Sequence, residues 1–201
     1  MKQITNIILA ILLLALASFA TETAGAKAPL GFKWGQEVNL SECEDFEEVA
    51  MYFVTCKTKT VPKPIQNLDF VYLLLYKGNL VKITAFMENI EDDPYGTKGT
   101  KAYENMKSIL SKKYGEPASS AEIIGRELYQ ESSEFYQCLM YSGCGMFFSF
   151  WGEEDGSQVA VQLSGLARGR GFIKLIYESK AYKKAMIEAK QYTNQEASEN
   201  L

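Results

Sequence analysis

The chain has 201 residues, of which 47% are hydrophobic and 23% are charged, and its formal net charge is −4. This length and composition predict a globular domain with a substantial core, and the mildly acidic balance argues against a nucleic-acid partner, which attracts dense positive patches. The chain contains no histidine, which excludes Ser-His-Asp and Cys-His hydrolysis in their usual forms and zinc sites built on histidine.

Residues 1–26 have the pattern of a secretory signal peptide. Lys2 supplies the positive start, Ile7–Ala17 is an apolar run, and small-residue cleavage sites end at Ala20 and Ala26. The run is shorter than the about 20 residues that span a bilayer, so we predict cleavage rather than a retained anchor. The predicted destination is the periplasm, with secretion as the second choice, and the mature protein is predicted to have no transmembrane segment.

The four cysteines of the chain are expected to form two disulfides after export, for which three connectivities exist. We predict the local pairs Cys43–Cys56 and Cys138–Cys144. Metal binding and a redox role are the alternatives. The spacing does not favour them, because twelve and five residues separate the paired cysteines, whereas zinc and redox motifs usually place two residues between them. The sequence predicts no metal and no cofactor.

The first elements predicted after the signal are a strand, a helix and a second strand. The strand covers Gly31–Gly35, and a Ser-x-x-Glu capping box opens a helix over Glu42–Ala50. The β-rich run Met51–Val61 predicts a strand that returns along this helix. A short helix and a returning strand have similar reach, which brings the first two cysteines together.

A β-hairpin and a long amphipathic helix follow. Leu68–Tyr76 and Asn79–Met87 flank a Lys-Gly turn and predict the two strands of the hairpin. Apolar residues at helical spacing predict a helix over Thr100–Tyr114, and Gly115 ends it with a left-handed cap.

Two acidic clusters lie in polar turns. Glu91–Asp93 suggests Ca²⁺ coordination, but its spacing departs from the alternating pattern of a calcium loop. Glu153–Asp155 suggests the paired carboxylates of a glycosidase, but the Gly-Ser that follows is typical of a hairpin turn. We interpret both clusters as solvated turns.

The second half of the chain predicts an extended piece at Arg126–Gln130, a short helix, three strands and a last helix. The last five elements are helix Ser133–Tyr141, strands Gly145–Gly152, Gln158–Gly165 and Gly171–Glu178, and helix Lys180–Gln191. Residues 193–201 are predicted to form a flexible tail.

Together these elements predict the α+β class, with antiparallel β-meanders and helices packed on one face. We predict a single domain over residues 27–192. A helix and an antiparallel meander occur twice in order, so the domain divides into two topologically similar halves, residues 27–117 and 118–192, with no residue repeat at a fixed period.

The segment GFKWG at residues 31–35, the hairpin, and a helix closing in YGEP at residues 114–117 together resemble small exported bacterial α+β proteins. These include the β-lactamase-inhibitor-protein type and the small lipoprotein of the outer-membrane assembly machine. The resemblance covers residues 31–117 and implies binding or scaffolding rather than catalysis. The chain lacks the lipidated cysteine and the Gly-Met helix start of the assembly lipoprotein, so no functional residue is carried over.

The aromatic run Met146–Trp151 is the most unusual composition in the chain. Alternation divides it between two faces, and the face with Phe147 and Trp151 is a candidate exposed patch for binding a partner or ligand. The structural interpretation, which the pattern favours, is a central strand buried on both sides, or one whose outer aromatics lean on neighbouring strands. The other candidate binding residues are two tyrosines of a neighbouring strand and two arginines of a glycine-rich loop: Tyr72, Tyr76, Arg168 and Arg170.

The sequence therefore predicts an exported, non-enzymatic protein that binds a cell-envelope component or another protein, as an inhibitor or accessory factor. No catalytic residue is predicted. The alternatives are a histidine-independent envelope enzyme that uses carboxylates, and a small-ligand-binding module.

Overall fold

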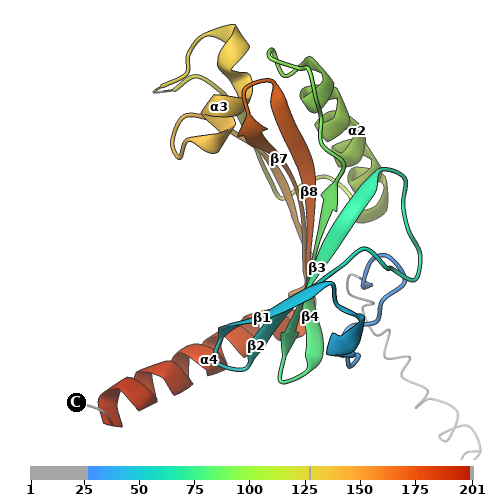
Figure 1. Ribbon diagram of the computed structural model, residues 1–201, viewed down its shortest axis with the longest axis vertical. Coiled ribbons are helices and arrows are strands. Elements are labelled where there is room, and N and C mark those ends of the chain that lie inside the picture. The colour runs from blue at the N-terminus through green and yellow to red at the C-terminus, as the bar shows by residue number, and fades with distance from the viewer. Residues whose placement is uncertain (1–26, 127, 200–201) are drawn as a thin grey trace, which may run out of the picture.

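The computed structural model describes residues 27–126 and 128–199, so the predicted signal peptide lies outside the described residues. An eight-stranded sheet forms the centre of the molecule, in the order β1-β2-β3-β4-β8-β7-β6-β5. Every neighbouring pair of strands is antiparallel, and helices lie on both sides of the sheet (Figure 1). The structure confirms the predicted α+β class with antiparallel meanders. The prediction that the helices pack on one face is wrong, because the last helix packs on the other face through a separate apolar cluster.

The strands are β1 (Asp45–Ala50), β2 (Phe53–Thr58), β3 (Leu68–Tyr76), β4 (Asn79–Met87), β5 (Ser119–Ile123), β6 (Met146–Gly152), β7 (Gln158–Ala167) and β8 (Arg170–Glu178). The helices are α2 (Thr97–Tyr114), α3 (Phe135–Met140) and α4 (Lys180–Glu199), with short 3₁₀ turns at Leu40–Glu42 and Ser132–Glu134. Strands β1–β4 and β5–β8 form two four-stranded meanders, which join through their last strands, β4 and β8.

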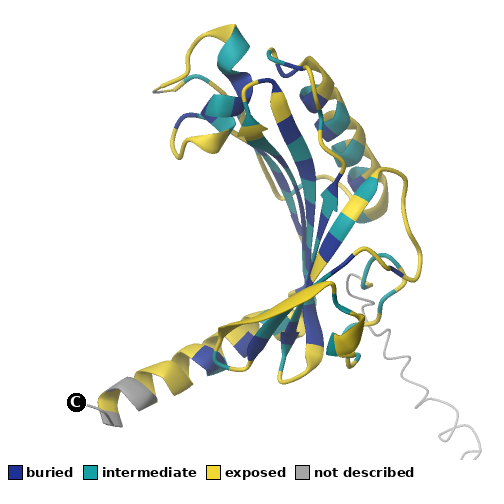
Figure 2. Cartoon of the chain, viewed as in Figure 1, coloured by how far each residue is buried: buried dark blue, intermediate teal, exposed yellow. Residues whose placement is uncertain are grey.

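Alternation along the strands gives the sheet two different faces. The inner face is packed by α2, α3 and the segment before β1, and it forms the main core (Figure 2). Its strand residues are aliphatic and buried: Val71, Leu73, Leu75, Ile83, Ala85, Val159, Val161, Leu163, Ile173 and Leu175. On the opposite, outer face, Ala185 and Ala189 of α4 pack with Phe53 and Val81 near the turn between β3 and β4.

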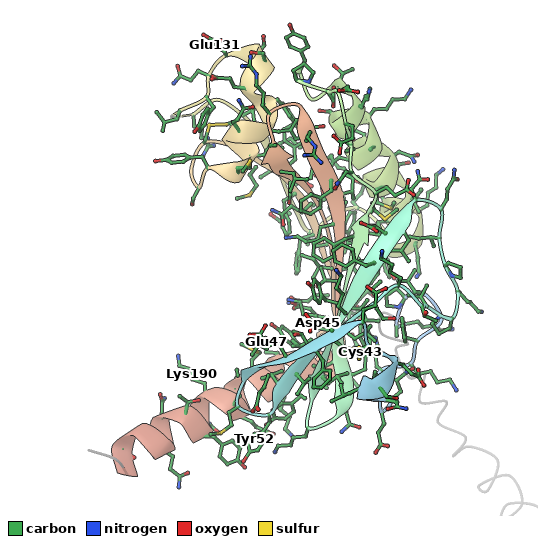
Figure 3. All side chains as sticks on the ribbon, in the orientation of Figure 1. Cys43, Asp45, Glu47, Tyr52, Glu131 and Lys190 are labelled. Atoms are coloured by element: carbon green, nitrogen blue, oxygen red, sulfur yellow. A yellow bond between two sulfur atoms is a disulfide. The ribbon has the colours of Figure 1, made fainter. Side chains whose placement is uncertain are left out.

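Helix α4 is attached to the two turns at this end of the sheet. The ammonium nitrogen of Lys77 lies 5.1, 5.0 and 5.4 Å from the ring centroids of Tyr52, Tyr76 and Tyr192. The Tyr76 hydroxyl donates to Glu188 of α4 at 3.1 Å. Figure 3 shows Tyr52 beside α4, where its ring meets Tyr192 edge-on. One lysine therefore links the β1–β2 turn, the β3–β4 turn and the last helix through cation–π contacts.

The hairpin of β3 and β4 has the predicted bounds. Lys77 and Gly78 have φ angles of 50° and 80°, as the type I′ turn of a two-residue hairpin requires. Helix α2 ends before Gly115 (φ 81°) as predicted, but it begins at Thr97 instead of Thr100.

The predicted helix Glu42–Ala50 is wrong. Asn39 caps a 3₁₀ turn by accepting a hydrogen bond from the Ser41 N–H at 3.1 Å, and Asp45–Ala50 is the edge strand β1. A helix of this length is marginal without packing. Pairing with β2 satisfies the backbone of this segment better, because β2 offers a free edge directly across a tight turn.

Two strand predictions are also wrong. Gly31–Gly35 forms no strand, because both terminal glycines have positive φ angles (83° and 74°) that interrupt an extended chain. The described residues of Arg126–Gln130 form no strand, and Ser119–Ile123 pairs with β6 instead. The last helix also continues past its predicted end at Gln191.

Both predicted disulfides are present. The Cα atoms of Cys43 and Cys56 lie 5.4 Å apart, and those of Cys138 and Cys144 lie 5.1 Å apart. The first bond joins the segment before β1 to β2, and the second joins α3 to the segment before β6. The pair Cys43–Cys56 is correct although a β-hairpin, not a helix, brings its cysteines together.

The carboxylate of Asp93 connects the start of α2 with α3. Asp93 is 4% exposed, and it accepts hydrogen bonds from the Gly99 N–H (2.9 Å) and the Tyr136 hydroxyl (2.7 Å). Burial by itself would raise the pKa of Asp93, but these hydrogen bonds outweigh burial and hold the pKa below its usual range. Burial and the Asp93 carboxylate raise the pKa of Tyr136. Asp93, predicted as part of a solvated turn, is therefore a buried helix cap.

Tyr136 reaches Asp93 because glycines surround it. A Cβ atom at Gly165 would lie 2.0 Å from the Tyr136 carbonyl oxygen, and one at Gly171 would lie 2.2 Å from its ring. A Cβ atom at Gly99 would lie 2.2 Å from its hydroxyl. These three positions on β7, β8 and α2 admit only glycine while Tyr136 keeps this place.

We expect removal of either disulfide to lower the free energy of unfolding, and the longer loop to cost more, because the entropy of loop closure grows with the logarithm of loop length. The paired cysteines are 13 and 6 positions apart, so the chain-entropy model gives losses of about 3 kcal/mol for Cys43→Ser/Cys56→Ser and about 2 kcal/mol for Cys138→Ser/Cys144→Ser. Urea unfolding of the two double variants measures both losses. Unchanged midpoints in both would contradict a stabilising role.

We expect Asp93→Asn to flatten the acid dependence of stability. Because its folded pKa is depressed, Asp93 contributes stability above the usual carboxyl pKa of about 4, and this is lost as pH falls through the folded value. The variant should be less stable at pH 7 by about 1.5–3 kcal/mol, the range for hydrogen bonds to a charged group. Thermal unfolding from pH 7 to pH 2 measures this, with the exposed Asp92→Asn as the matched control. Parallel pH curves for wild type and Asp93→Asn would refute this role.

Candidate functional site

The outer face of the sheet carries aromatic rings where a solvated face is expected. Strand pairing places Phe70, Phe86, Lys174, Gln162 and Phe148 in one row across β3, β4, β8, β7 and β6. We call six residues of this surface the aromatic face: Phe70, Tyr72, Phe86, Phe148, Phe150 and Phe172. All are at least partly exposed, in contrast to the alternating residues of the inner face (Figure 2).

The rings of the aromatic face pack in two groups, one of four rings on β3, β4 and β8, and one pair on β6, Phe148 and Phe150, whose centroids lie 6.4 Å apart. Phe70 and Phe86 stack with centroids 4.7 Å apart, and Phe172 and Tyr72 each lie 5.7 Å from Phe86. The ammonium of Lys57 lies 4.6 Å from the Phe70 centroid. Mutual contact fixes the ring positions before any partner arrives, so the surface is preorganised.

Lys174 lies in the middle of this surface, between Phe86 on β4 and Gln162 on β7. Burial lowers the pKa of Lys174, and the neighbouring charge of Lys82 lowers it further. Lys82 is paired with Glu178 at 2.8 Å, whereas Lys174 has no hydrogen-bond or ion-pair partner among the described residues. A desolvated cation without a counter-charge favours an anionic group in a binding partner.

The interpretation of Phe147 and Trp151 as an exposed patch is wrong. Their exposed fractions are 9% and 1%, and both side chains belong to the inner core. The Trp151 indole N–H donates to the Gly115 carbonyl oxygen at 2.8 Å, and the Ser149 hydroxyl bonds the Tyr103 hydroxyl at 2.7 Å. The polar groups of Ser149 and Trp151 make this side of β6 look solvent-facing in the sequence, but both groups have hydrogen-bond partners inside the protein.

The two candidate tyrosines have different environments. Tyr72 is 37% exposed and belongs to the aromatic face. Tyr76 is half-buried under α4 through its bond to Glu188. The structure therefore keeps Tyr72 as a candidate contact residue and gives Tyr76 a role in attaching α4.

The two candidate arginines already have partners within the chain. Arg170 forms a two-point ion pair with Glu91, at 2.6 and 2.9 Å. Arg168 donates to the Ser133 hydroxyl at 3.3 Å. Arg168 lies in the β7–β8 turn and Arg170 is the first residue of β8, away from the row that contains Lys174. The structure therefore does not join them with Tyr72 in one site.

Most of the aromatic face was not predicted as a site, although the sequence contains its signal. In β8 one alternating set is uniformly apolar (Ile173, Leu175 and Tyr177), and the other mixes Phe172, Lys174, Ile176 and Glu178. A set of mixed polar and apolar residues indicates the outer side of a sheet that is covered on its other face. The residues paired with this set across the neighbouring strands, Phe86, Phe70 and Phe148, can then be assigned to the same outer face.

Three carboxylates of the two acidic clusters form ion pairs or hydrogen bonds within the described structure. Glu91 pairs with Arg170 and Asp93 caps α2, while Asp155 accepts a hydrogen bond from the Ser157 N–H at 2.9 Å. Within residues 27–126 and 128–199, no three His, Cys, Asp or Glu side chains gather as a metal site.

No family model, curated protein or solved structure matches this chain. In the described part of the chain, no helix is long and apolar enough to cross a membrane.

We expect alanine substitutions to cost much more stability in the core than on the aromatic face. Trp151→Ala should cost about 3–5 kcal/mol, as for large buried aromatic residues, whereas Tyr72→Ala on the open face should cost about 1 kcal/mol. Guanidinium unfolding of both variants measures the difference. Equal losses would contradict the assignment of the two faces.

Proposed function

We propose that this is an exported, periplasmic, non-catalytic protein whose aromatic face binds a partner protein, as an inhibitor or accessory factor. The observation that carries the proposal is a preorganised group of six partly exposed aromatic residues around the unpaired Lys174. The two disulfides support an oxidising compartment outside the cytoplasm.

The composition of the aromatic face supports protein binding. An antiparallel sheet with one covered face normally presents polar side chains on the other. Contiguous apolar patches are rare on surfaces that meet only water, and aromatic residues dominate the energetics of protein interfaces. Tyr72 is the most exposed ring, and it packs on Phe70 and Phe86, so it is the first candidate for an anchor residue.

The charges indicate the chemistry of the partner. Lys57 and Lys174 both lie on this surface, whereas Glu178 at its margin is neutralised by Lys82. A carboxylate of the partner would restore a counter-charge to Lys174 and favour its charged form. We therefore expect an acidic partner surface with an apolar centre.

An enzyme that uses carboxylates is the alternative class. Such an enzyme needs a pair of acidic side chains converging on a substrate. Glu91, Asp93 and Glu178 each have a partner within the chain, which favours binding over catalysis.

Capture from a cell-envelope extract of the producing organism tests the proposal. The exported protein is immobilised as wild type, as Tyr72→Glu, as Lys174→Glu, and as the control Tyr95→Glu, which alters a 63% exposed tyrosine outside the sheet. We expect wild type and control to retain the same protein. Both face variants should bind the purified partner at least about tenfold more weakly in calorimetry, as expected for central interface residues.

Equal retention by all four proteins would show that the aromatic face is not the binding surface. Tighter binding by Lys174→Glu would contradict the acidic character of the partner. Far-UV circular dichroism of each variant establishes that the fold is intact.

A further inference from the structure

A second candidate site lies at the end of the sheet where β3 turns into β4. A cavity of about 900 Å³ opens between the segment before β1, this turn, and the first turns of α4. Figure 1 shows the turn between β3 and β4 at the lower end of the sheet, where α4 begins. Its described lining includes no residue of the aromatic face, so it is independent of the proposed protein-binding surface.

The wall of the cavity is apolar. Phe32 and Trp34 come from the segment before β1, Leu80 and Val81 from β4, and Ala185 from α4. Leu80 and Val81 are buried, whereas Phe32 and Trp34 are partly exposed. The cavity is therefore suited to an apolar chain or ring, and its volume lies within the about 300–1,000 Å³ typical of small-molecule sites.

The charged residues around this wall are mainly cations, although the whole chain has a net charge of −4. The lining contains the carboxylates Asp155 and Glu188 and six lysines: Lys27, Lys33, Lys63, Lys77, Lys180 and Lys184. Glu188 lies 3.8 Å from both Lys77 and Lys184. Hydrogen bonds from Ser157 and the nearby charge of Lys180 hold the pKa of Asp155 below its usual range. The remaining lysines, at positions 27, 33 and 63, give the cavity an excess of positive charge.

A buried hydroxyl in the lining lacks a hydrogen-bond partner. Ser179 is 2% exposed, and its Oγ has no partner among the described residues. The residue precedes α4, and Lys180 and Ala181 of the first helical turn also line the cavity. A buried hydroxyl without a partner is costly, and the start of a helix attracts negative charge. A bound anion would satisfy both.

We propose that this cavity binds an anionic amphiphile, a small molecule with an apolar chain or ring and a carboxylate or phosphate head. The head accepts a hydrogen bond from Ser179 and is surrounded by the lysines, and the apolar part lies against Phe32 and Trp34. An inorganic anion alone would leave the apolar wall of the cavity exposed to water. A neutral lipid would leave Ser179 without a hydrogen-bond acceptor and the lysines without a counter-charge.

Fluorescence titration tests the proposal. The chain has two tryptophans, Trp34 and Trp151, so Trp151→Phe leaves Trp34 in the cavity wall as the only reporter. The exported protein is purified from the envelope fraction and titrated with decanoate, decyl phosphate, 1-decanol and inorganic phosphate. We expect saturable binding of decanoate or decyl phosphate. 1-Decanol should bind at least about tenfold more weakly, corresponding to about 1.4 kcal/mol.

Matched variants separate the charge effect from general surface effects. Lys33→Glu/Lys63→Glu should weaken binding of the anionic probe at least about tenfold, and added salt should weaken it in wild type. Ser179→Ala should weaken it without changing 1-decanol binding. Lys101→Glu/Lys112→Glu reverses two exposed lysines of α2, outside the cavity, and should leave binding unchanged.

Three results would overturn the proposal: no saturable binding of either anionic probe, equal affinity for 1-decanol and decanoate, or equal loss in the cavity and control double variants. Calorimetry on the chain with both tryptophans repeats the decisive titration, so a fold defect of Trp151→Phe does not decide the outcome.

Discussion

The buried carboxylate of Asp93 is the constraint on which the packing of the inner face depends. Its side chain holds α2 and α3, and its backbone N–H donates to the Gly169 carbonyl of the β7–β8 turn at 2.9 Å. At the other end of the same seam, the Ser179 N–H donates to the Val81 carbonyl at 2.9 Å. Strands β4 and β8, where the two meanders join, are therefore held together at both ends by backbone hydrogen bonds beyond their paired residues.

This arrangement explains why the two faces of the sheet differ in use. Helices α2 and α3 pack on the inner face, and α4, the remaining long helix of the described residues, packs near the β3–β4 turn. The rest of the outer face must be stabilised by its own side chains. Stacked rings such as Phe70 and Phe86 do this by burying part of their area against each other.

The sequence is sufficient to predict the elements whose signals are local. The Lys77-Gly78 turn specifies its hairpin and Gly115 specifies the end of α2, because positive φ angles are local requirements. It misleads where a distant partner decides the outcome. Asp45–Ala50 has an acidic, helix-compatible composition but pairs with β2, and Trp151 is internal because a carbonyl from Gly115 receives its N–H. The aromatic face depends on register between strands far apart in sequence, so alternation within one strand is not enough to locate it.

The Cys43–Cys56 bond also affects the edge of the sheet, because it lies next to the edge strand β1. All six residues of this edge strand are exposed, and Asp45, Glu47 and Glu48 place negative charges along it, which discourages pairing with strands of other molecules. Behind it lies β2, whose Phe53, Cys56 and Thr58 are buried. The bond cross-links the segment before the charged strand to its neighbour β2 in the same sheet. Reduction of the bond would remove this cross-link, and separation of β1 from β2 would then leave the edge of β2 open to pairing with another chain.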